Sequence, residues 1–249
     1  MKRFLILLCL CCCCAASSLY AADDSTAVIA RLARQLGVKP ADITPAPIPG
    51  VYRLLLGPQV AYVSADGRYF LRGDIIDLKS GNNLTVAERD QARVTYLKKL
   101  GESDMIVFAP AHIKRSITVL TDIDCDYCRL LEQDRPALNA MGVEVRYLFY
   151  PRDGVGTASW NKAVSVWCAK DQKTAFTAAM QGKPVKPLKC DAAPVTAGYE
   201  FGRLLGIDGT PAIITDRGKM IAGYIPIDAM ADMLGVEPGH AASPAGAKK

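Results

Sequence analysis

Two cysteines, in the run Cys125-Asp126-Tyr127-Cys128, are the residues of this sequence best suited to chemistry. They follow an apolar, β-rich run, SITVLTDI, and begin a segment of helical character. A helix N-terminus carries partial positive charge and free backbone N–H groups, so a thiolate there is stabilised. Cys125 is therefore expected to have a lowered pKa and to be the attacking sulfur. Cys128, one turn later, is the expected resolving partner, so the pair can cycle between dithiol and disulfide.

A zinc site is the alternative interpretation, because C-x-x-C is also half of a zinc knuckle. A four-cysteine zinc module normally has a second close pair, whereas Cys168 and Cys190 lie 22 positions apart. That separation suits a structural disulfide better. The sequence favours redox chemistry and predicts no metal and no other cofactor.

Residues 1–22 have the three-part layout of a secretory signal peptide. Lys2 and Arg3 precede an apolar run from Phe4 to about Ala16, and small residues follow. The run is short of the roughly 20 residues that span a bilayer, so we expect cleavage and a soluble mature protein rather than a retained anchor. Lipid attachment is a weaker alternative, because the cysteines of this segment follow Leu or Cys rather than a small residue.

Five of the nine cysteines lie in this segment, and four remain in the mature chain. An even number in an exported protein indicates disulfides, and four cysteines allow three pairings. The mature chain has 28 basic and 25 acidic residues, a net charge of +3, and its basic residues are scattered. No nucleic-acid binding is expected from so mild a balance. With 50% hydrophobic and 22% charged residues, the chain is not a mainly disordered one.

The N-terminal part reads as a small α+β unit. Apolar spacing predicts a helix over 26–38, and short strands are predicted within 51–56, 60–73 and 74–79, with a hairpin turn at 65–67. A unit of about 60 residues is marginally stable alone and would gain from dimerising.

Thr85 and Glu88 form a capping-box pattern that predicts a helix through Leu100. Its polar character on all sides slightly favours a connector between domains over a surface helix packed on one domain. After it, the order β-α-β, helices, β-β-α predicts an α/β domain with a central sheet. The expected elements are strands at 116–123 and 143–151, helices at 125–142 (with a kink at Pro136), 159–182, 192–206 and 227–234, a hairpin about 216–218, and a disordered tail.

Five motifs, in order, resemble the thioredoxin-fold disulfide isomerases of the bacterial periplasm, the DsbC/DsbG family, and DsbC more than DsbG. They are PAPIPGVYRLLL, TVLTDIDCDYC, VRYLFYPRDG, VWCAKDQKTAF and LGIDGTPAII. The resemblance implies a V-shaped homodimer with an apolar cleft for misfolded chains. It divides the chain into a signal peptide (1–22), a cystatin-like dimerisation domain (23–84), a linker helix (85–104), an α/β thioredoxin-like catalytic domain with a helical insertion (105–236) and a tail (237–249).

The resemblance also assigns roles to the remaining cysteines. It implies that Cys125 is the nucleophile, that Cys128 resolves, and that Cys168 pairs with Cys190 as a structural disulfide. The expected partners are misfolded, disulfide-containing exported proteins and a membrane thiol reductase of the DsbD type, which would keep the site reduced. The expected activity is periplasmic thiol:disulfide isomerase and reductase.

Thr210 and Pro211 match the loop where thioredoxin folds carry a cis-proline beside the active sulfur, and with Tyr127 they are the candidate substrate-binding residues. The backbone of this Thr210–Pro211 loop would pair with an extended substrate strand without sequence preference. Taken without the resemblance, Thr-Pro would read as an ordinary turn.

One position departs from the family pattern, and a second lacks a group that thioredoxins carry. Asp126 stands where DsbC-like proteins carry Gly and DsbG-like proteins carry Pro. A carboxylate there disfavours a second negative charge, so Asp126→Gly is predicted to lower the pKa of Cys125 and make the couple more oxidising, although Asp126 also suits the first turn of a helix. Val119 replaces the buried acid that thioredoxins hold six residues before the first cysteine. Proton transfer at Cys128 must then use another group or water. Asp122 is nearer but not favoured, since a surface position would leave it out of reach.

Three rival functions stay open in the sequence. A DsbA-type dithiol oxidase would not need residues 23–104, which argues against it. A chaperone would use an apolar cleft, with the cysteines secondary. A DsbG-like protector of sulfenylated cysteines is poorly separated from an isomerase by sequence.

Overall fold

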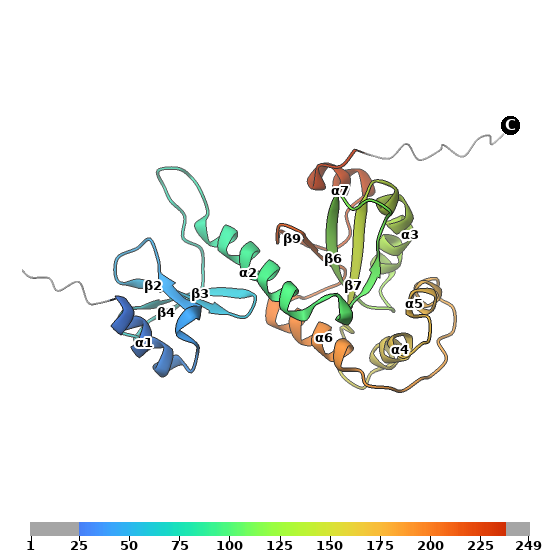
Figure 1. Cartoon of the computed structure of the whole chain (residues 1–249), viewed down its shortest axis with the longest axis horizontal. Coiled ribbons are helices and arrows are strands. Elements are labelled where there is room, and N and C mark those ends of the chain that lie inside the picture. The colour runs from blue at the N-terminus through green and yellow to red at the C-terminus, as the bar shows by residue number, and fades with distance from the viewer. Residues whose placement is uncertain (1–24, 238–249) are drawn as a thin grey trace, which may run out of the picture. The chain divides into compact units, whose positions relative to one another are not determined.

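The computed structural model describes residues 25–237 and divides into two compact units (Figure 1). The expected signal peptide at 1–22 and almost all of the expected tail lie outside the described residues. The first unit contains α1 and most of the N-terminal sheet, and the second contains the chain from Leu71 onward together with Leu55–Ala61. Within residues 25–237, no helix combines the length and the apolar character needed to cross a bilayer.

One helix and a four-stranded sheet build the N-terminal unit, with strand order β1-β2-β3-β4. Helix α1 buries Val28 and Leu32, which are one turn apart, and it packs against β1, where the buried Ile43 pairs with Leu54 of β2. This is the apolar spacing that predicts the helix. The elements are α1 (Ser25–Leu36), β1 (Ile43–Pro45), β2 (Val51–Leu56), β3 (Gln59–Ser64) and β4 (Phe70–Leu71).

The predicted hairpin turn is present between β3 and β4. Gly67 has a φ of 74°, in the left-handed region that glycine adopts without strain, and its N–H donates to the carbonyl of Ser64 at 2.8 Å. Strand β1 is an addition to the predicted elements, because it lies in a Pro-rich segment whose composition indicates a link.

The strand predicted at 74–79 is wrong. This segment forms only an isolated bridge, because its polar side chains bond the backbone locally. The carboxylate of Asp77 accepts from the Lys79 N–H at 2.9 Å and from the Ser80 hydroxyl at 2.7 Å. Such local bonds compete with a sheet ladder.

A five-stranded sheet with order β5-β7-β6-β8-β9 forms the centre of the second unit. Strands β6 and β7 are parallel, and the other neighbours are antiparallel. The strands are β5 (Ile106–Phe108), β6 (Arg115–Thr121), β7 (Val143–Phe149), β8 (Ala212–Thr215) and β9 (Met220–Ala222). The helices are α2 (Leu84–Leu100), α3 (Asp126–Ala140), α4 (Ala158–Trp167), α5 (Gln172–Met180), α6 (Ala193–Leu205) and α7 (Ile227–Leu234).

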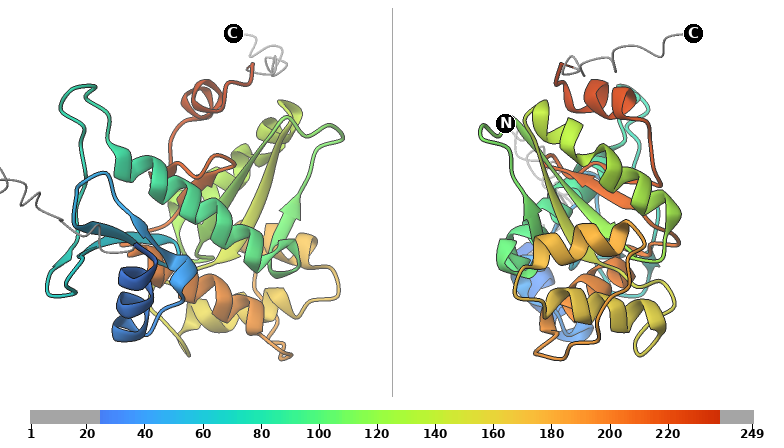
Figure 2. Two further views of the ribbon diagram at one scale, coloured as in Figure 1. Left: turned by 60° about the vertical axis from the view of Figure 1, so that its left-hand side comes forward. Right: turned by 90° about the vertical axis from the view of Figure 1, so that its right-hand side faces the viewer.

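Both faces of this sheet are covered, and successive strand residues point to opposite sides. Val119 and Tyr147 join the core beneath α3, α4, α5 and α7, while Leu120 and Leu148 join the core beneath α2 and α6. Figure 2 shows α2 and α6 crossing the same face of the sheet. Burial on both faces explains why the strands read as nearly continuous apolar runs.

Helix α2 begins at a different cap from the predicted one. Asn83 is the N-cap, and its side-chain oxygen accepts from the Val86 N–H at 3.1 Å. Thr85 is buried and accepts from the Ile75 N–H at 2.8 Å instead. The capping-box prediction at Thr85 is therefore wrong, because an equally good capping residue two positions earlier takes the role.

The C-terminal half of α2 is packed on the second unit. The Tyr96 ring stacks on Phe201 of α6 with centroids 4.9 Å apart, and Leu97 joins the same cluster. Arg93 donates to the carbonyl of Gly218 at 2.9 Å, between β8 and β9. Over its C-terminal half, α2 is thus a surface helix of this unit. Its polar composition slightly favours the other alternative, a connector between domains.

The single helical stretch predicted at 159–182 is two helices, α4 and α5. Asp171 starts α5 by accepting from the Thr174 N–H at 3.1 Å, so a capping residue interrupts the apolar periodicity. Pro136 lies inside α3, which is assigned as one helix from Asp126 to Ala140.

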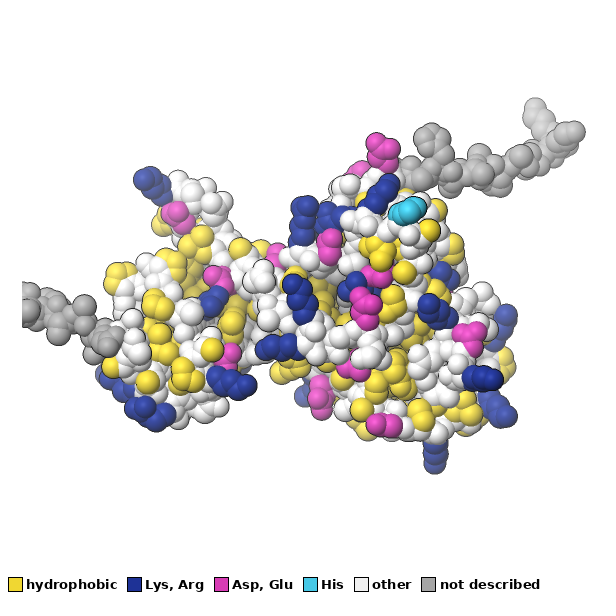
Figure 3. Space-filling view, viewed as in Figure 1, with side chains coloured by type: hydrophobic (Ala, Val, Ile, Leu, Met, Phe, Trp, Pro, Cys, Tyr) yellow, Lys and Arg dark blue, Asp and Glu magenta, His cyan; other side chains and the backbone are white. Residues whose placement is uncertain are grey.

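The surface carries charges of both signs. In the view of Figure 3, basic and acidic side chains are interspersed. Several are paired, as in Arg115 with Asp216 at 2.5 Å and Arg89 with Asp74 at 2.5 Å.

Candidate active site

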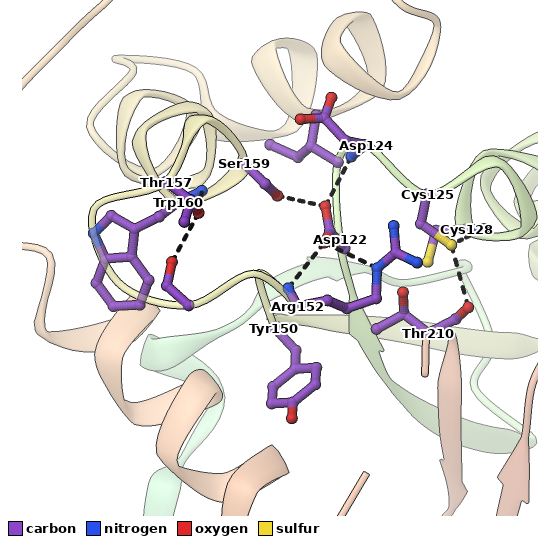
Figure 4. A network of polar contacts seen from close by, with 12 residues as sticks. Asp122, Asp124, Cys125, Cys128, Tyr150, Arg152, Thr157, Ser159, Trp160 and Thr210 are labelled. Atoms are coloured by element: carbon purple, nitrogen blue, oxygen red, sulfur yellow. Dashed lines mark hydrogen bonds and ion pairs between the residues drawn. The ribbon is translucent and has the colours of Figure 1, made fainter. Parts of the chain in front are cut away.

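Cys125 and Cys128 lie at the junction of β6 and α3 (Figure 4). Cys125 is the N-cap of α3, and its sulfur accepts a hydrogen bond from the Cys128 backbone N–H at 3.4 Å. Both are free thiols and both are buried, with 4% and 0% of their surfaces exposed. The helix N-terminus therefore directs an N–H group and partial positive charge at the Cys125 sulfur, as predicted.

Thr210 lies against Cys125 from the loop that precedes β8. The Cys125 sulfur lies 3.2 Å from the Thr210 carbonyl oxygen, to which it donates when protonated, and the Thr210–Pro211 peptide bond is cis. Tyr127, between the cysteines, is 62% exposed. The structure thus brings Cys125, Cys128 and Thr210–Pro211 together and leaves Tyr127 open to solvent.

The surroundings of Cys125 favour its thiolate. A hydrogen bond from the Cys128 side chain is the largest cause that lowers the pKa of Cys125 from 9.0 to about 5. The Thr210 side chain, the Cys128 N–H and the charge of Arg152 act in the same direction, and together they outweigh burial, which opposes ionisation. Cys125 is therefore a thiolate at neutral pH, the state in which sulfur is nucleophilic.

The surroundings of Cys128 favour its thiol. Burial, and then its hydrogen bond to Cys125, raise the pKa of Cys128. The two sulfurs, one turn apart on the same helix, are therefore held in opposite protonation states. This asymmetry makes Cys125 suitable as the attacking sulfur and Cys128 as a protonated reserve.

An ion pair between a buried carboxylate and a partly exposed guanidinium lies beside the cysteines. The Asp122 carboxylate faces Arg152 Nε at 3.2 Å, and it accepts from the Arg152 backbone N–H at 2.9 Å and from the Ser159 hydroxyl. Burial opposes ionisation of Asp122, but these hydrogen bonds outweigh it and lower its pKa. In Figure 4 the Arg152 side chain extends from Asp122 toward the two sulfurs.

This pair is not among the residues predicted from the sequence. A surface position is expected there for Asp122, whereas its side chain is buried, and no role is expected for Arg152. A signal was available in the topology. Strands β6 and β7 are parallel neighbours, so the residues that follow them, Asp122 and Arg152, meet at the same edge of the sheet.

The two other acids near Cys125 face cations. Asp124 accepts from Lys162 Nζ at 2.6 Å, and Asp126 lies 3.3 Å from Arg129 Nη1. The Asp126 side chain is 91% exposed, so water and salt screen its charge. Its expected effect on the pKa of Cys125 stays a prediction, and this exposure makes the predicted effect small.

Cys168 and Cys190 form a disulfide with a Cα–Cα distance of 5.6 Å and a sequence separation of 22. They are therefore not available as ligands beside Cys125 and Cys128, and the four-cysteine zinc interpretation is wrong. Within residues 25–237, no cluster of three His, Cys, Asp or Glu side chains could hold a metal ion.

These features define a class of protein. A low-pKa thiol at a helix N-terminus, a buried second thiol one turn later and a five-stranded sheet with a parallel β6-α3-β7 unit are the parts of a thioredoxin-like thiol:disulfide oxidoreductase.

Comparison with known proteins identifies the family within this class. Residues 102–236 match the thioredoxin-like domain, and residues 20–86 match the disulfide bond isomerase protein N-terminal domain. The thiol:disulfide interchange protein DsbC of Escherichia coli K12 is 36% identical over 215 residues, 86% of this chain and 88% of that protein. DsbC of Dickeya dadantii is 37% identical over 214 residues, 86% of this chain and 87% of that protein. A crystal structure of a disulfide interchange protein from Neisseria gonorrhoeae, 27% identical, covers 54% of this chain and 96% of its own with a TM-score of 0.49.

The chain belongs to the DsbC family of thiol:disulfide interchange proteins. The fold class predicted from the sequence, a thioredoxin-like domain preceded by a small α+β domain, is confirmed.

Proposed function

We propose that this protein is a periplasmic thiol:disulfide isomerase and reductase that rearranges incorrect disulfides in exported proteins. The observation that carries the proposal is the placement of two free, buried thiols one turn apart, with the Cys125 sulfur at the N-cap of α3 accepting from the Cys128 N–H. Relatives named thiol:disulfide interchange protein support it.

The reaction begins when the Cys125 thiolate attacks one sulfur of a substrate disulfide. A mixed disulfide forms, and the other substrate sulfur leaves as a thiolate. That thiolate, or another in the substrate, can displace Cys125 and leave a rearranged disulfide with no net change in electrons. Alternatively, Cys128 displaces the substrate, which is then reduced by two electrons while Cys125 and Cys128 become a disulfide.

Substrate binding is assigned to the residues around Cys125. The Thr210–Pro211 loop beside Cys125 would pair with an extended substrate chain, and exposed Tyr127 and Leu130 offer apolar contacts without sequence preference. Cys168 and Cys190 serve a structural role through their disulfide.

Whenever Cys128 resolves, the site becomes oxidised, so isomerase activity needs a supply of electrons. A membrane thiol reductase of the DsbD type is the proposed donor. Export through cleavage of residues 1–22 would place the protein in the periplasm, and mass spectrometry of the mature N-terminus tests this. A retained Met1 would contradict it.

The proposed domains are a dimerisation domain at 23–84, a linker at 85–104 and a catalytic domain at 105–236. The match to the isomerase N-terminal domain at 20–86 supports a homodimer. Sedimentation of the mature protein is expected to give twice the chain mass at micromolar concentration, and a monomer there would remove the dimer from the proposal.

A trapping experiment tests the proposed chemistry. A Cys128→Ala variant mixed with a scrambled multi-disulfide protein is expected to accumulate a covalent complex through Cys125, because the resolving thiol is missing. A Cys125→Ser variant should give none. Equal complex formation by both variants would contradict the assignment of Cys125 as the nucleophile.

A further inference from the structure

A buried carboxyl group lies one helical turn beyond Cys128. Glu132 is at position i+4 from Cys128 on α3, so the two side chains are neighbours on one face of the helix. Both residues are buried. Cys128 attacks only as a thiolate, yet burial and its hydrogen bond to Cys125 raise the pKa of its thiol. The resolving step therefore needs a proton acceptor in this buried region.

The contacts of Glu132 leave one of its oxygens open. Oε1 accepts from Arg135 Nε at 2.9 Å and from the Thr177 hydroxyl at 2.9 Å. Oε2 is buried and has no hydrogen-bond partner among residues 25–237. A buried polar atom without a partner is uncommon in folded proteins and calls for an explanation. An oxygen that takes a proton during the reaction is such an explanation.

Tyr147 belongs to the same buried core cluster as Cys125 and Cys128. It lies on β7, where it pairs in register with Val119 of β6, and its buried hydroxyl also has no hydrogen-bond partner among residues 25–237. Burial, then the nearby Glu132 carboxylate and more weakly Cys128 raise the pKa of Tyr147. The phenol therefore keeps its proton at neutral pH and lies within the electrostatic reach of both Glu132 and Cys128.

We propose that Glu132 accepts the proton of Cys128 in the resolving step, with the Tyr147 hydroxyl passing it on. The inference rests on the proposed function and deepens it. In the mixed disulfide, Cys128 gives its proton to the Tyr147 oxygen while Tyr147 gives its own to Glu132 Oε2. The Cys128 thiolate then attacks Cys125, the Cys125–substrate bond breaks, and the substrate leaves as a thiolate. The substrate thiolate takes a proton from water, and Glu132 returns its proton to water.

Other charged groups pack around α3. Arg135 lies over the Phe108 ring at 3.9 Å, and Lys173 of α5 lies 6.0 Å from the same ring. On the side of α7, Asp134 accepts from the Tyr224 hydroxyl at 2.7 Å. The pH response of the resolving step between pH 6 and 8 is attributed to proton transfer from Cys128, the reacting thiol of that step.

A two-phase reaction separates this step from the first attack. The reduced protein is mixed with 5,5′-dithiobis(2-nitrobenzoate) in a stopped-flow instrument, and release of the coloured thiol is followed from pH 6 to 8. The first phase reports attack by Cys125 and depends on reagent concentration. The second reports attack by Cys128 on the mixed disulfide and does not. Cys128→Ala removes the second phase and so assigns it.

Glu132→Gln is expected to slow the second phase about 100-fold at pH 7, the size typical of a lost general base, and to leave the first phase within about twofold. In this variant the rate of the second phase should rise tenfold per pH unit, because hydroxide must then remove the proton. In the unsubstituted protein that rate should rise less steeply with pH. Tyr147→Phe should also slow the second phase.

Glu144→Gln is the matched control. Glu144 is also a buried glutamate paired with an arginine, Arg146, but it lies at the start of β7, away from the edge where Cys125 lies. It should change neither phase. The proposal is overturned if Glu132→Gln keeps the second-phase rate and slope of the unsubstituted protein, or if Glu144→Gln slows that phase equally. Loss of the first phase in the unsubstituted protein would instead contradict the proposed function.

Discussion

Cys125 and Cys128 share one turn of helix, yet the protein holds their protons very differently. Cys125 accepts hydrogen bonds from Cys128 and lies at the positive end of α3, whereas the burial of Cys128 outweighs the hydrogen bonds that would stabilise its charge. A stabilised thiolate favours the reduced form of such a pair, which makes its disulfide the more oxidising.

The first prediction concerns the titration of Cys125. Thiolate absorbance at 240 nm should rise with a midpoint near pH 5, the pKa set mainly by the hydrogen bond from Cys128. Cys128→Ala removes that bond and should move the midpoint to higher pH. A midpoint near 9 in the unsubstituted protein would contradict the assignment.

The same shift has a consequence for stability. Because the folded pKa lies below the ordinary value of 9.0, ionisation of Cys125 stabilises the reduced folded protein, fully above pH 9 and not at all once the pH falls below about 5. As the pH is lowered from 9 to 5, the free energy of unfolding of the reduced protein, measured in urea, should therefore fall relative to that of a Cys125→Ser variant. Parallel profiles would contradict it.

Arg152 provides a second prediction at this scale. Its charge adds to the hydrogen bonds that lower the pKa of Cys125, so Arg152→Gln should raise that pKa and slow alkylation by iodoacetamide at pH 5 to 6. Arg146→Gln, which changes another arginine beside a buried carboxylate, is the matched control and should leave alkylation unchanged. Asp126→Gly should lower the pKa of Cys125, because it removes a negative charge. The shift should be smaller than that of Arg152→Gln, because Asp126 is exposed.

At the scale of elements, α2 is held to the second unit by backbone contact as well as by side chains. Gly218 has a φ of 86°, and a Cβ there would lie 2.0 Å from the Asp90 carbonyl oxygen of α2. Gly218→Ala should therefore lower the free energy of unfolding by more than about 2 kcal/mol, the sum of left-handed strain and a displaced helix.

Gly182 provides the matched control for this prediction. Its φ is 79°, but a Cβ there would meet nothing within 4 Å. Gly182→Ala should cost about 1–2 kcal/mol from backbone strain alone. If both variants lose the same stability in urea unfolding, the close approach of α2 to Gly218 is not significant.

Most elements of the second unit could be predicted from the sequence, because β6, α3 and β7 have strong apolar patterns. The failures have local physical causes. Asn83 and Thr85 are both good caps, and only the packing of Thr85 against the 74–79 segment decides between them. The cysteine pair could be predicted from its spacing. The Asp122–Arg152 pair could not be predicted in this way, because 30 residues separate its members. Predicting it requires knowing that β6 pairs with β7.

At the scale of the whole molecule, the chain combines a small N-terminal unit with a larger thioredoxin-like one, whose helices α4, α5 and α6 are inserted between β7 and β8. A disulfide closes this insertion between the end of α4 and the segment before α6. Cys190 is exposed, so the disulfide contributes mainly by shortening the loops of the unfolded chain.

The disulfide prediction follows from loop length. Replacing Cys168 and Cys190 together by alanine should lower the free energy of unfolding by about 3 kcal/mol, the loop-closure value for a loop of this size. Unfolding in urea without reductant measures it, and the first phase of the cysteine reaction should keep its rate. No loss of stability would show that the disulfide has another role.

The most direct measurement is recovery of activity from a scrambled multi-disulfide protein in the presence of the mature protein and a little reductant. The account predicts recovery that Cys125→Ser abolishes, because every productive path passes through a mixed disulfide at Cys125. A Cys128→Ala variant should retain part of the activity, since a substrate thiol can also displace Cys125. Recovery that survives Cys125→Ser, or oxidation of reduced substrate without any recovery of scrambled substrate, would contradict the account.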